Sequence, residues 1–124
     1  MIIVSDTSPI TSLAAINRLN LLQQLYGSII IPEAVYRELT EVSTPVPGTR
    51  EVLSADWIQM RSVVNRSLVD NLKALPLDEG ESEAIVLAKE LNAEILLIDE
   101  RRGRAEASRQ GLRITGLRRS ARQV

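Results

Sequence analysis

The chain has 124 residues, the usual size of one domain, and we expect a single domain over residues 1–124. A formal charge of −1 and a pI of about 5.5 exclude the strongly basic surface of a dedicated DNA-binding protein. Cysteine and histidine are absent, which excludes disulfides, thiolate metal sites and catalysis by a Ser-His-Asp triad.

Apolar strand-like runs alternate with helical segments along the chain. We expect strands at about residues 2–6, 28–31, 57–63, 95–98 and 112–115. We expect helices at about residues 10–16, 19–25, 33–42, 49–53, 67–75, 79–91 and 101–110. Ser8 is the expected N-cap of the first helix, Gly27 ends the second, and Pro76 stops the helix that precedes it. This alternation predicts an α/β fold with three layers, α/β/α, around a central parallel sheet of five strands.

Two of the apolar runs end on an aspartate, Asp6 in the first and Asp99 in the fourth. The C-terminal edge of an open α/β sheet is where ligands bind, so these two acids suggest one shared site for a divalent cation. Each aspartate alone is also explained as the N-cap of the next helix. Without histidine or cysteine, a cation must be held by oxygen atoms, which favours Mg²⁺ or Mn²⁺.

Four carboxylates lie within residues 78–83, at the start of an expected helix. Asp78 and Glu81 have the spacing of a capping box, which needs no function. Glu81 shares the apolar stripe that begins at Ala84 and faces the sheet, whereas Glu83 lies to one side. We therefore expect Glu81 to be the site acid and keep Glu83 as the second choice.

Four segments, taken in order, resemble the PIN-domain family of the small prokaryotic type. They are Ile3–Ile10, Pro32–Leu39, Leu77–Ile85 and Leu97–Arg104. Each is weak alone, but four in the right order are specific, and the resemblance extends to about Gly116. It implies a sheet ordered 3-2-1-4-5 and a metal-dependent endoribonuclease that cleaves single-stranded RNA, as in toxins of the VapC type.

The resemblance also assigns roles to individual acids. The family's first acid falls on Asp6, its second on Glu38 and its last on Asp99, while its third, 18 residues before the last, falls on Glu81. Asp6, Glu81 and Asp99 would bind Mg²⁺ or Mn²⁺. Glu38 would support the ligands or orient the attacking water, although a solvated surface glutamate explains it equally well.

Substrate contacts are expected beside these acids. The family has a small hydroxyl residue near its first acid, which Ser8 or Thr7 supplies, with Ser8 taken as the substrate-binding residue. From residue 101 to residue 122 the chain has eight arginines against one acid. Arg101 and Arg104, the closest to Asp99, are the candidates for binding RNA phosphates, although a solvated helix face explains most of these arginines.

The resemblance implies RNA as a partner, a small antitoxin in toxin pairs and a homodimer. No membrane-length apolar stretch occurs, so a cytoplasmic protein is expected. Two departures, Glu81 where Asp is common and a divergent or truncated end after about residue 116, support an alternative. In it, the chain is a weak or inactive PIN-fold module that binds nucleic acid or protein. A receiver or haloacid-dehalogenase-type phosphatase is disfavoured, because the required lysine and second aspartate are missing.

Overall fold

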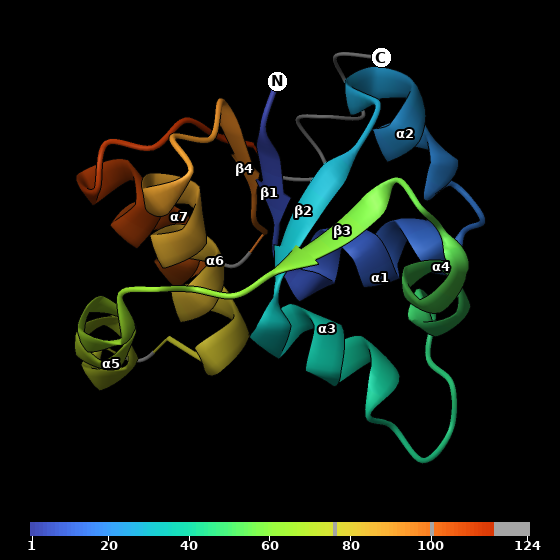
Figure 1. Ribbon diagram of the computed structural model, residues 1–124, viewed down its shortest axis with the longest axis horizontal. Coiled ribbons are helices and arrows are strands. Elements are labelled where there is room, and N and C mark those ends of the chain that lie inside the picture. The colour runs from blue at the N-terminus through green and yellow to red at the C-terminus, as the bar shows by residue number, and fades with distance from the viewer. Residues whose placement is uncertain (76, 100, 116–124) are drawn as a thin grey trace.

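Five parallel strands form one sheet in the order β3-β2-β1-β4-β5. The computed structural model describes residues 1–75, 77–99 and 101–115 (Figure 1). The strands are β1 (Ile3–Ser5), β2 (Ile29–Pro32), β3 (Ile58–Arg61), β4 (Ile95–Leu97) and β5 (Ile114–Thr115). This order is the expected 3-2-1-4-5, and the fifth strand is reduced to two residues paired with β4. The stop expected at Pro76 and the chain end after residue 116 lie outside the described residues.

Seven helices occur in the described residues, close to their expected positions. They are α1 (Thr7–Ala15), α2 (Asn20–Tyr26), α3 (Glu33–Thr40), α4 (Thr49–Ser54), α5 (Arg66–Ala74), α6 (Glu79–Glu90) and α7 (Arg101–Arg109). Gly27 ends α2 at a φ of +80°, as expected. The expectation for Ser8 was wrong, because the N-cap of α1 is Asp6, whose backbone is extended. The chain passes from β1 into the helix without a connecting loop.

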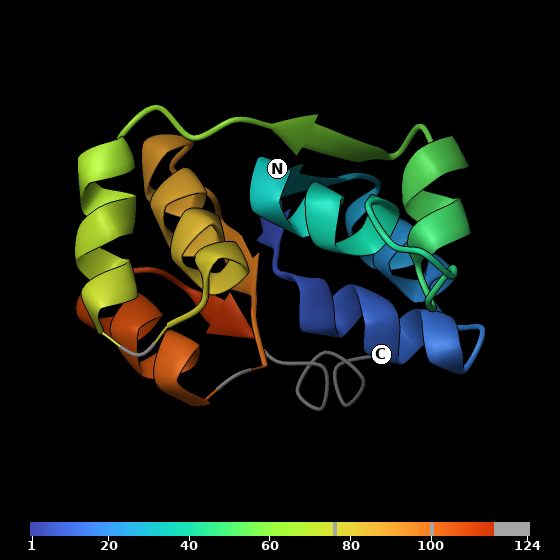
Figure 2. The same cartoon turned by 90° about the horizontal axis from the view of Figure 1, so that it is seen from below.

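The helices cover both faces of the sheet. α1 to α4 pack on one face and α5 to α7 on the other, so that the sheet is the middle of three layers (Figure 2). Neighbouring strand residues point to opposite faces, with Ile3 in the first core and Val4 in the second. Burial on both faces explains why the strand sequences are apolar without alternation.

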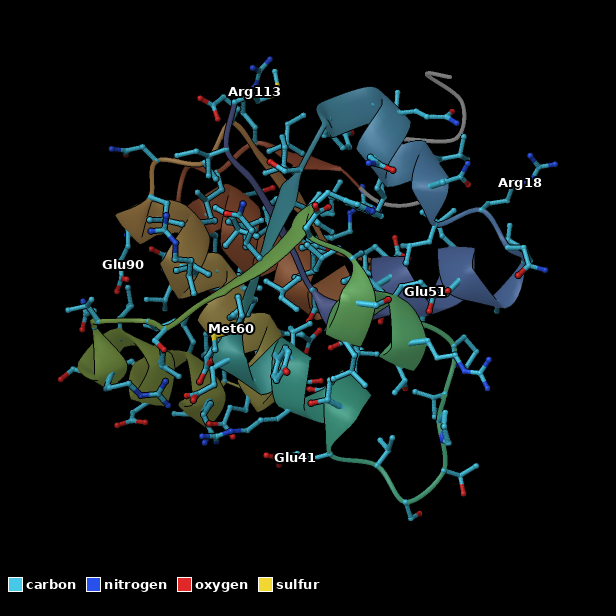
Figure 3. All side chains as sticks on the ribbon, turned by 45° about the vertical axis from the view of Figure 1, so that its right-hand side comes forward. Arg18, Glu41, Glu51, Met60, Glu90 and Arg113 are labelled. Atoms are coloured by element: carbon cyan, nitrogen blue, oxygen red, sulfur yellow. The ribbon has the colours of Figure 1, made fainter. Side chains whose placement is uncertain are left out.

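Two elements, β3 and α6, differ from the other strands and helices in how far they are buried. β3 is an edge strand in which only Ile58 is buried, and its Met60, labelled in Figure 3, is 44% exposed, so the alternation in its sequence does not give a continuous buried face. α6 is the most enclosed helix, because residues 80–88 are all buried against the sheet and neighbouring helices. Its first turn therefore places side chains in the interior.

None of the helices in the described ranges is long and apolar enough to cross a membrane.

Candidate active site

Asp6 lies at the C-terminal end of β1, in the middle of the sheet. Its backbone N–H donates to the Leu97 carbonyl at 2.9 Å, so β1 and β4 stay joined up to this residue. The side chain is only 3% exposed, and burial raises the pKa of its carboxyl from 3.8 to about 7. The charges of Asp78, Glu81 and Glu38 add to the increase in pKa, and the backbone N–H of Thr7 opposes it. Asp6 therefore binds a proton near neutral pH unless a cation replaces it.

Three carboxylates gather around Gly80, in the first turn of α6. A Cβ atom at this position would lie 2.6 Å from Glu38 Oε1, 3.4 Å from Asp6 Oδ1 and 3.5 Å from Asp78 Oδ1. The first distance is shorter than real Cβ contacts, so only glycine fits here without moving Glu38. The absence of a side chain at residue 80 lets acids from β1, α3 and α6 come together.

Glu38 reaches this cluster from the middle of α3. Much of the residue is exposed, but its carboxylate end lies against α6, and the loss of hydration raises its pKa. The Thr7 hydroxyl opposes that increase, and the charges of Asp78 and Glu79 add to it. Thr7 Oγ1 is buried and has no partner of normal hydrogen-bond geometry within the described residues. The site thus contains a hydroxyl with unused hydrogen-bonding capacity.

Glu81 is held by the predicted capping box, which is confirmed. Its N–H donates to Asp78 Oδ1 at 2.7 Å, and its Oε1 accepts from the Asp78 N–H at 3.0 Å. Glu81 is 6% exposed, and its Oε2 lies 3.2 Å from where a Cβ on Gly103 of α7 would be. The carboxylate is therefore placed between the first turn of α6 and α7, close enough to Asp6 to raise its pKa.

Glu83, the second choice for the third acid, is used in contacts between helices. It is 3% exposed and accepts from the Ala34 N–H at 2.9 Å and from Arg66 Nη1 at 2.7 Å. Arg66 Nη2 also lies 3.5 Å from Glu79. These bonds link α6 to α3 and α5, a role that sequence reasoning missed because both partners are distant along the chain.

The remaining predicted residues lie around the same edge of the sheet. Ser5 of β1 is paired in register with Leu97 of β4, so Asp6 and Asp99 follow the ends of adjacent strands. Asp99 is half-buried, and α7 begins two residues later with the exposed Arg101.

Arg104 and Ser8 are both half-buried. Arg104 is the fourth residue of α7. Ser8 lies in the first turn of α1, where its carbonyl accepts from the Thr11 hydroxyl at 3.1 Å. The hydroxyl beside Glu38 is that of Thr7.

Within residues 1–75, 77–99 and 101–115, no three acidic side chains are grouped so that they could hold a metal ion as they stand. Asp78 was expected only to cap α6, yet its oxygen also faces the position of a Gly80 Cβ. The sequence feature that could have indicated this role of Asp78 is its position directly before the helical turn that contains Gly80.

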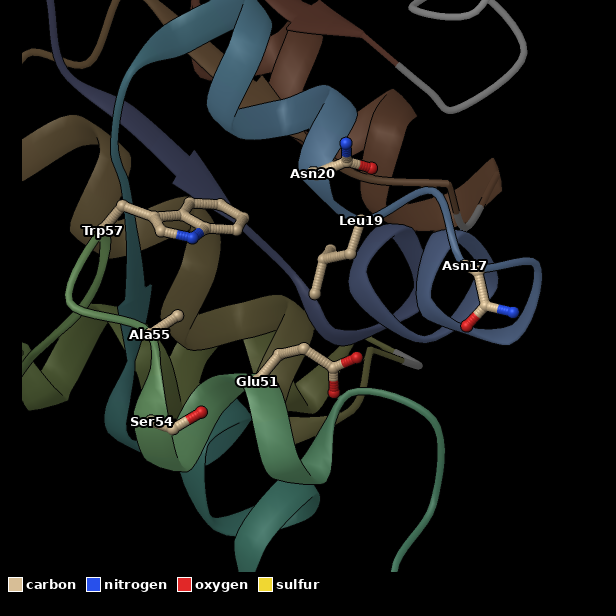
Figure 4. A pocket seen from close by; sticks show the side chains of 7 residues that line it. All are labelled: Asn17, Leu19, Asn20, Glu51, Ser54, Ala55 and Trp57. Atoms are coloured by element: carbon tan, nitrogen blue, oxygen red, sulfur yellow. The ribbon is translucent and has the colours of Figure 1, made fainter.

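A separate hollow of about 300 Å³ lies on the α1–α4 side (Figure 4). It is lined by Asn17, Leu19, Asn20, Glu51, Ser54, Ala55 and Trp57. None of the acids described above lines it, so it is distinct from the candidate site.

Residues 2–118 match the family model DUF3368, which describes a PIN domain. The chain belongs to the PIN-domain family. The structure is similar to that of a PilT N-terminus domain protein from the hyperthermophilic archaeon Sulfolobus solfataricus, with a TM-score of 0.65 and 18% sequence identity. The similarity covers 97% of this PIN domain and 90% of the archaeal chain, and at that identity it supports the fold alone. No curated protein sequence matches. PIN domains are generally nucleases.

Proposed function

We propose that this PIN domain is a metal-dependent endoribonuclease that cleaves phosphodiester bonds of single-stranded RNA. The observation that carries the proposal is the gathering of Asp6, Glu38 and Asp78 oxygens around Gly80, with the pKa of Asp6 raised to about 7. Carboxylates crowded in this way repel one another, and a divalent cation relieves the repulsion.

The residues present fit Mg²⁺ or Mn²⁺. With no cysteine or histidine in the chain, the donor set consists of oxygen atoms, which both cations prefer. The missing side chain at Gly80 lets Glu38, Asp6 and Asp78 oxygens approach one another, and the buried Thr7 hydroxyl has hydrogen-bonding capacity to spare among the described residues. By the PIN-domain resemblance, Asp6, Glu81 and Asp99 would hold the cation, and Asp6 is the acid that they share with the cluster around Gly80.

Each remaining group has a role in this proposal. A bound cation lowers the pKa of water and offsets the negative charge of the phosphate. Glu38, with its raised pKa, would orient the attacking water and accept its proton. Arg101, Arg104 and Ser8 would bind the RNA backbone, because the acids alone repel it.

The test is cleavage of a single-stranded RNA with Mg²⁺ or Mn²⁺ by the parent, Asp6→Asn and Asp56→Asn. Asn keeps the size of Asp but removes the charge that a cation needs. We expect Asp6→Asn to lose more than the roughly 10–100-fold typical of groups that only support metal ligands. Asp56 is exposed and precedes β3, at the opposite edge of the sheet, so Asp56→Asn should cleave as the parent does. A folded Asp6→Asn variant with parental activity would refute the proposal.

A non-catalytic module that binds nucleic acid or protein is the second candidate. The observation that favours it is the lack of a ready three-acid cation site in the part of the chain that the structure describes. RNA binding measured by fluorescence anisotropy, without cleavage in Mn²⁺, would support this candidate. An antitoxin partner, a homodimer and a cytoplasmic location stay predictions, which co-purification, light scattering and cell fractionation would test.

A further inference from the structure

The first turn of α3 receives its cap from another helix. Its N-cap residue is Pro32, which has no side-chain acceptor for the free N–H groups at the start of the helix. The buried carboxylate of Glu83, on α6, accepts from the Ala34 N–H at 2.9 Å. A negative charge is favourable at a helix N-terminus, so Glu83 supplies what Pro32 lacks.

Arg66 offsets the free-energy cost of burying the Glu83 carboxylate. Burying an ionised carboxylate is unfavourable unless it is paired and hydrogen-bonded. Arg66 Nη1, from α5, donates to Glu83 Oε2 at 2.7 Å, while Oε1 is the atom that receives the Ala34 N–H. Both carboxylate oxygens thus have a partner, and the three helices α3, α5 and α6 meet at one side chain.

Two of the contacts between α3 and α6 lie one helical turn apart. Ala34 and Glu38 are four residues apart on α3, and Gly80 and Glu83 are three residues apart on α6, so each pair shares a helix face. One contact joins Ala34 to Glu83, and the other brings Glu38 against Gly80. The contact between Ala34 and Glu83 can therefore fix how closely Glu38 approaches Gly80.

We propose that Glu83 is a positioning residue, which caps α3 from α6 and thereby holds the Glu38 carboxylate against Gly80 and Asp6. As a statement about cation binding, this inference rests on the proposed function. As a statement about where Glu38 lies, it stands on the two contacts alone.

The test compares Glu83→Ala, Glu83→Gln and the matched control Glu90→Ala. Glu90, which is labelled in Figure 3, is also a glutamate of α6. Its carboxylate accepts from the backbone N–H groups of Val64 and Asn65, at 3.1 and 2.7 Å. It lies at the opposite end of α6 from Gly80. The readouts are Mn²⁺ affinity by calorimetry and the position of Glu38 in crystal structures of the variants.

We expect Glu83→Ala to displace Glu38 from Gly80 and so to remove it from beside the ligand Asp6. Mn²⁺ binding should then weaken roughly 10–100-fold, as is typical when a group that supports metal ligands is lost. Glu83→Gln should recover much of the affinity, because its amide oxygen can still accept from the Ala34 N–H. Glu90→Ala should bind Mn²⁺ as the parent does. Glu38 unmoved in Glu83→Ala, or equal losses of affinity in Glu83→Ala and Glu90→Ala, would overturn the proposal.

If Glu83→Ala does not fold, Glu83→Asp decides. It keeps the charge beside Arg66, but its shorter side chain reaches less far toward the Ala34 N–H, so Glu38 should again be displaced. An unmoved Glu38 would overturn the proposal. If the parent neither binds Mn²⁺ nor cleaves RNA, the proposed function fails alone, since the position of Glu38 in the variants still decides the role of Glu83.

Discussion

Three properties of Asp6 decide its ionisation. It occupies the N-cap position of α1 without a side-chain capping hydrogen bond, it is buried at the end of a central strand, and other acids lie near it. A cap alone would favour the ionised carboxylate. Burial and the neighbouring charges outweigh that effect, so the pKa is raised to about 7. Perturbed carboxylates of this kind concentrate at functional sites.

This raised pKa predicts how stability depends on pH in the metal-free protein. In the unfolded chain Asp6 titrates near 3.8, and in the folded protein it titrates near 7, so the folded state binds the proton more tightly. The resulting stabilisation is fully present below about pH 4 and is lost as pH rises to about 7, by at most about 4 kcal/mol. Asp6→Asn, which carries no charge, should therefore become more stable relative to the parent across this range.

The measurement is the free energy of unfolding in urea, with a chelator present, at several pH values between 4 and 8. Asp56→Asn, at an exposed position, is the control. A constant difference in unfolding free energy between the parent and Asp6→Asn over this range would contradict the predicted titration.

At the scale of the element, α6 is the helix on which the site depends. Its first turn supplies the capping box, the glycine that admits the acids and the glutamate that caps α3. Its remaining turns are buried against the sheet and the helices beside it. The position of the cluster therefore depends on how α6 is packed.

Gly80→Ala should weaken cation binding at the site without destabilising the fold. Alanine is the better helix former by up to about 1 kcal/mol, so the variant should fold. The new Cβ would lie 2.6 Å from Glu38 Oε1, and the end of that flexible side chain must move away. We expect Mn²⁺ affinity, measured by calorimetry, to fall roughly tenfold or more while the melting temperature stays near that of the parent.

Ser67→Ala, at an exposed position on α5, is the control for Gly80→Ala and should leave both quantities unchanged. Parental Mn²⁺ affinity in Gly80→Ala would show that the room beside residue 80 is not needed for the cation.

At the scale of the molecule, two cores stabilise the sheet, one on each face, and leave its C-terminal edge for polar groups. The acids gathered at that edge oppose folding when no cation is present. If the proposed function holds, stability and cation binding are coupled, since any ligand that binds only the folded state stabilises it.

Mn²⁺ should raise the melting temperature of the parent. At a concentration about 100 times Kd, binding contributes about 2.7 kcal/mol. For a domain of this size that corresponds to an increase of very roughly 5–15 °C. Differential scanning fluorimetry at neutral pH with and without Mn²⁺ is the measurement, and Asp6→Asn should respond little. A parent that melts at the same temperature with millimolar Mn²⁺ would favour the binding-module candidate.

The sequence alone determined the succession of elements, the parallel sheet, the capping box at Asp78 and the strand ends that carry Asp6 and Asp99. These features follow from neighbours within a few residues, namely apolar periodicity and capping, and the resemblance to PIN domains added the strand order and the choice of acids.

Only the tertiary structure decided what Gly80 and Glu83 do. Glu83 and Ala34 are 49 residues apart in the sequence. No pattern within a few residues of either one predicts that Glu83 of α6 caps α3. Likewise, the contact of Glu38 with Gly80 and the place of the Thr7 hydroxyl beside Glu38 depend on how closely the helices approach at the end of β1. Packing sets such distances, and packing depends on side chains from the whole chain at once.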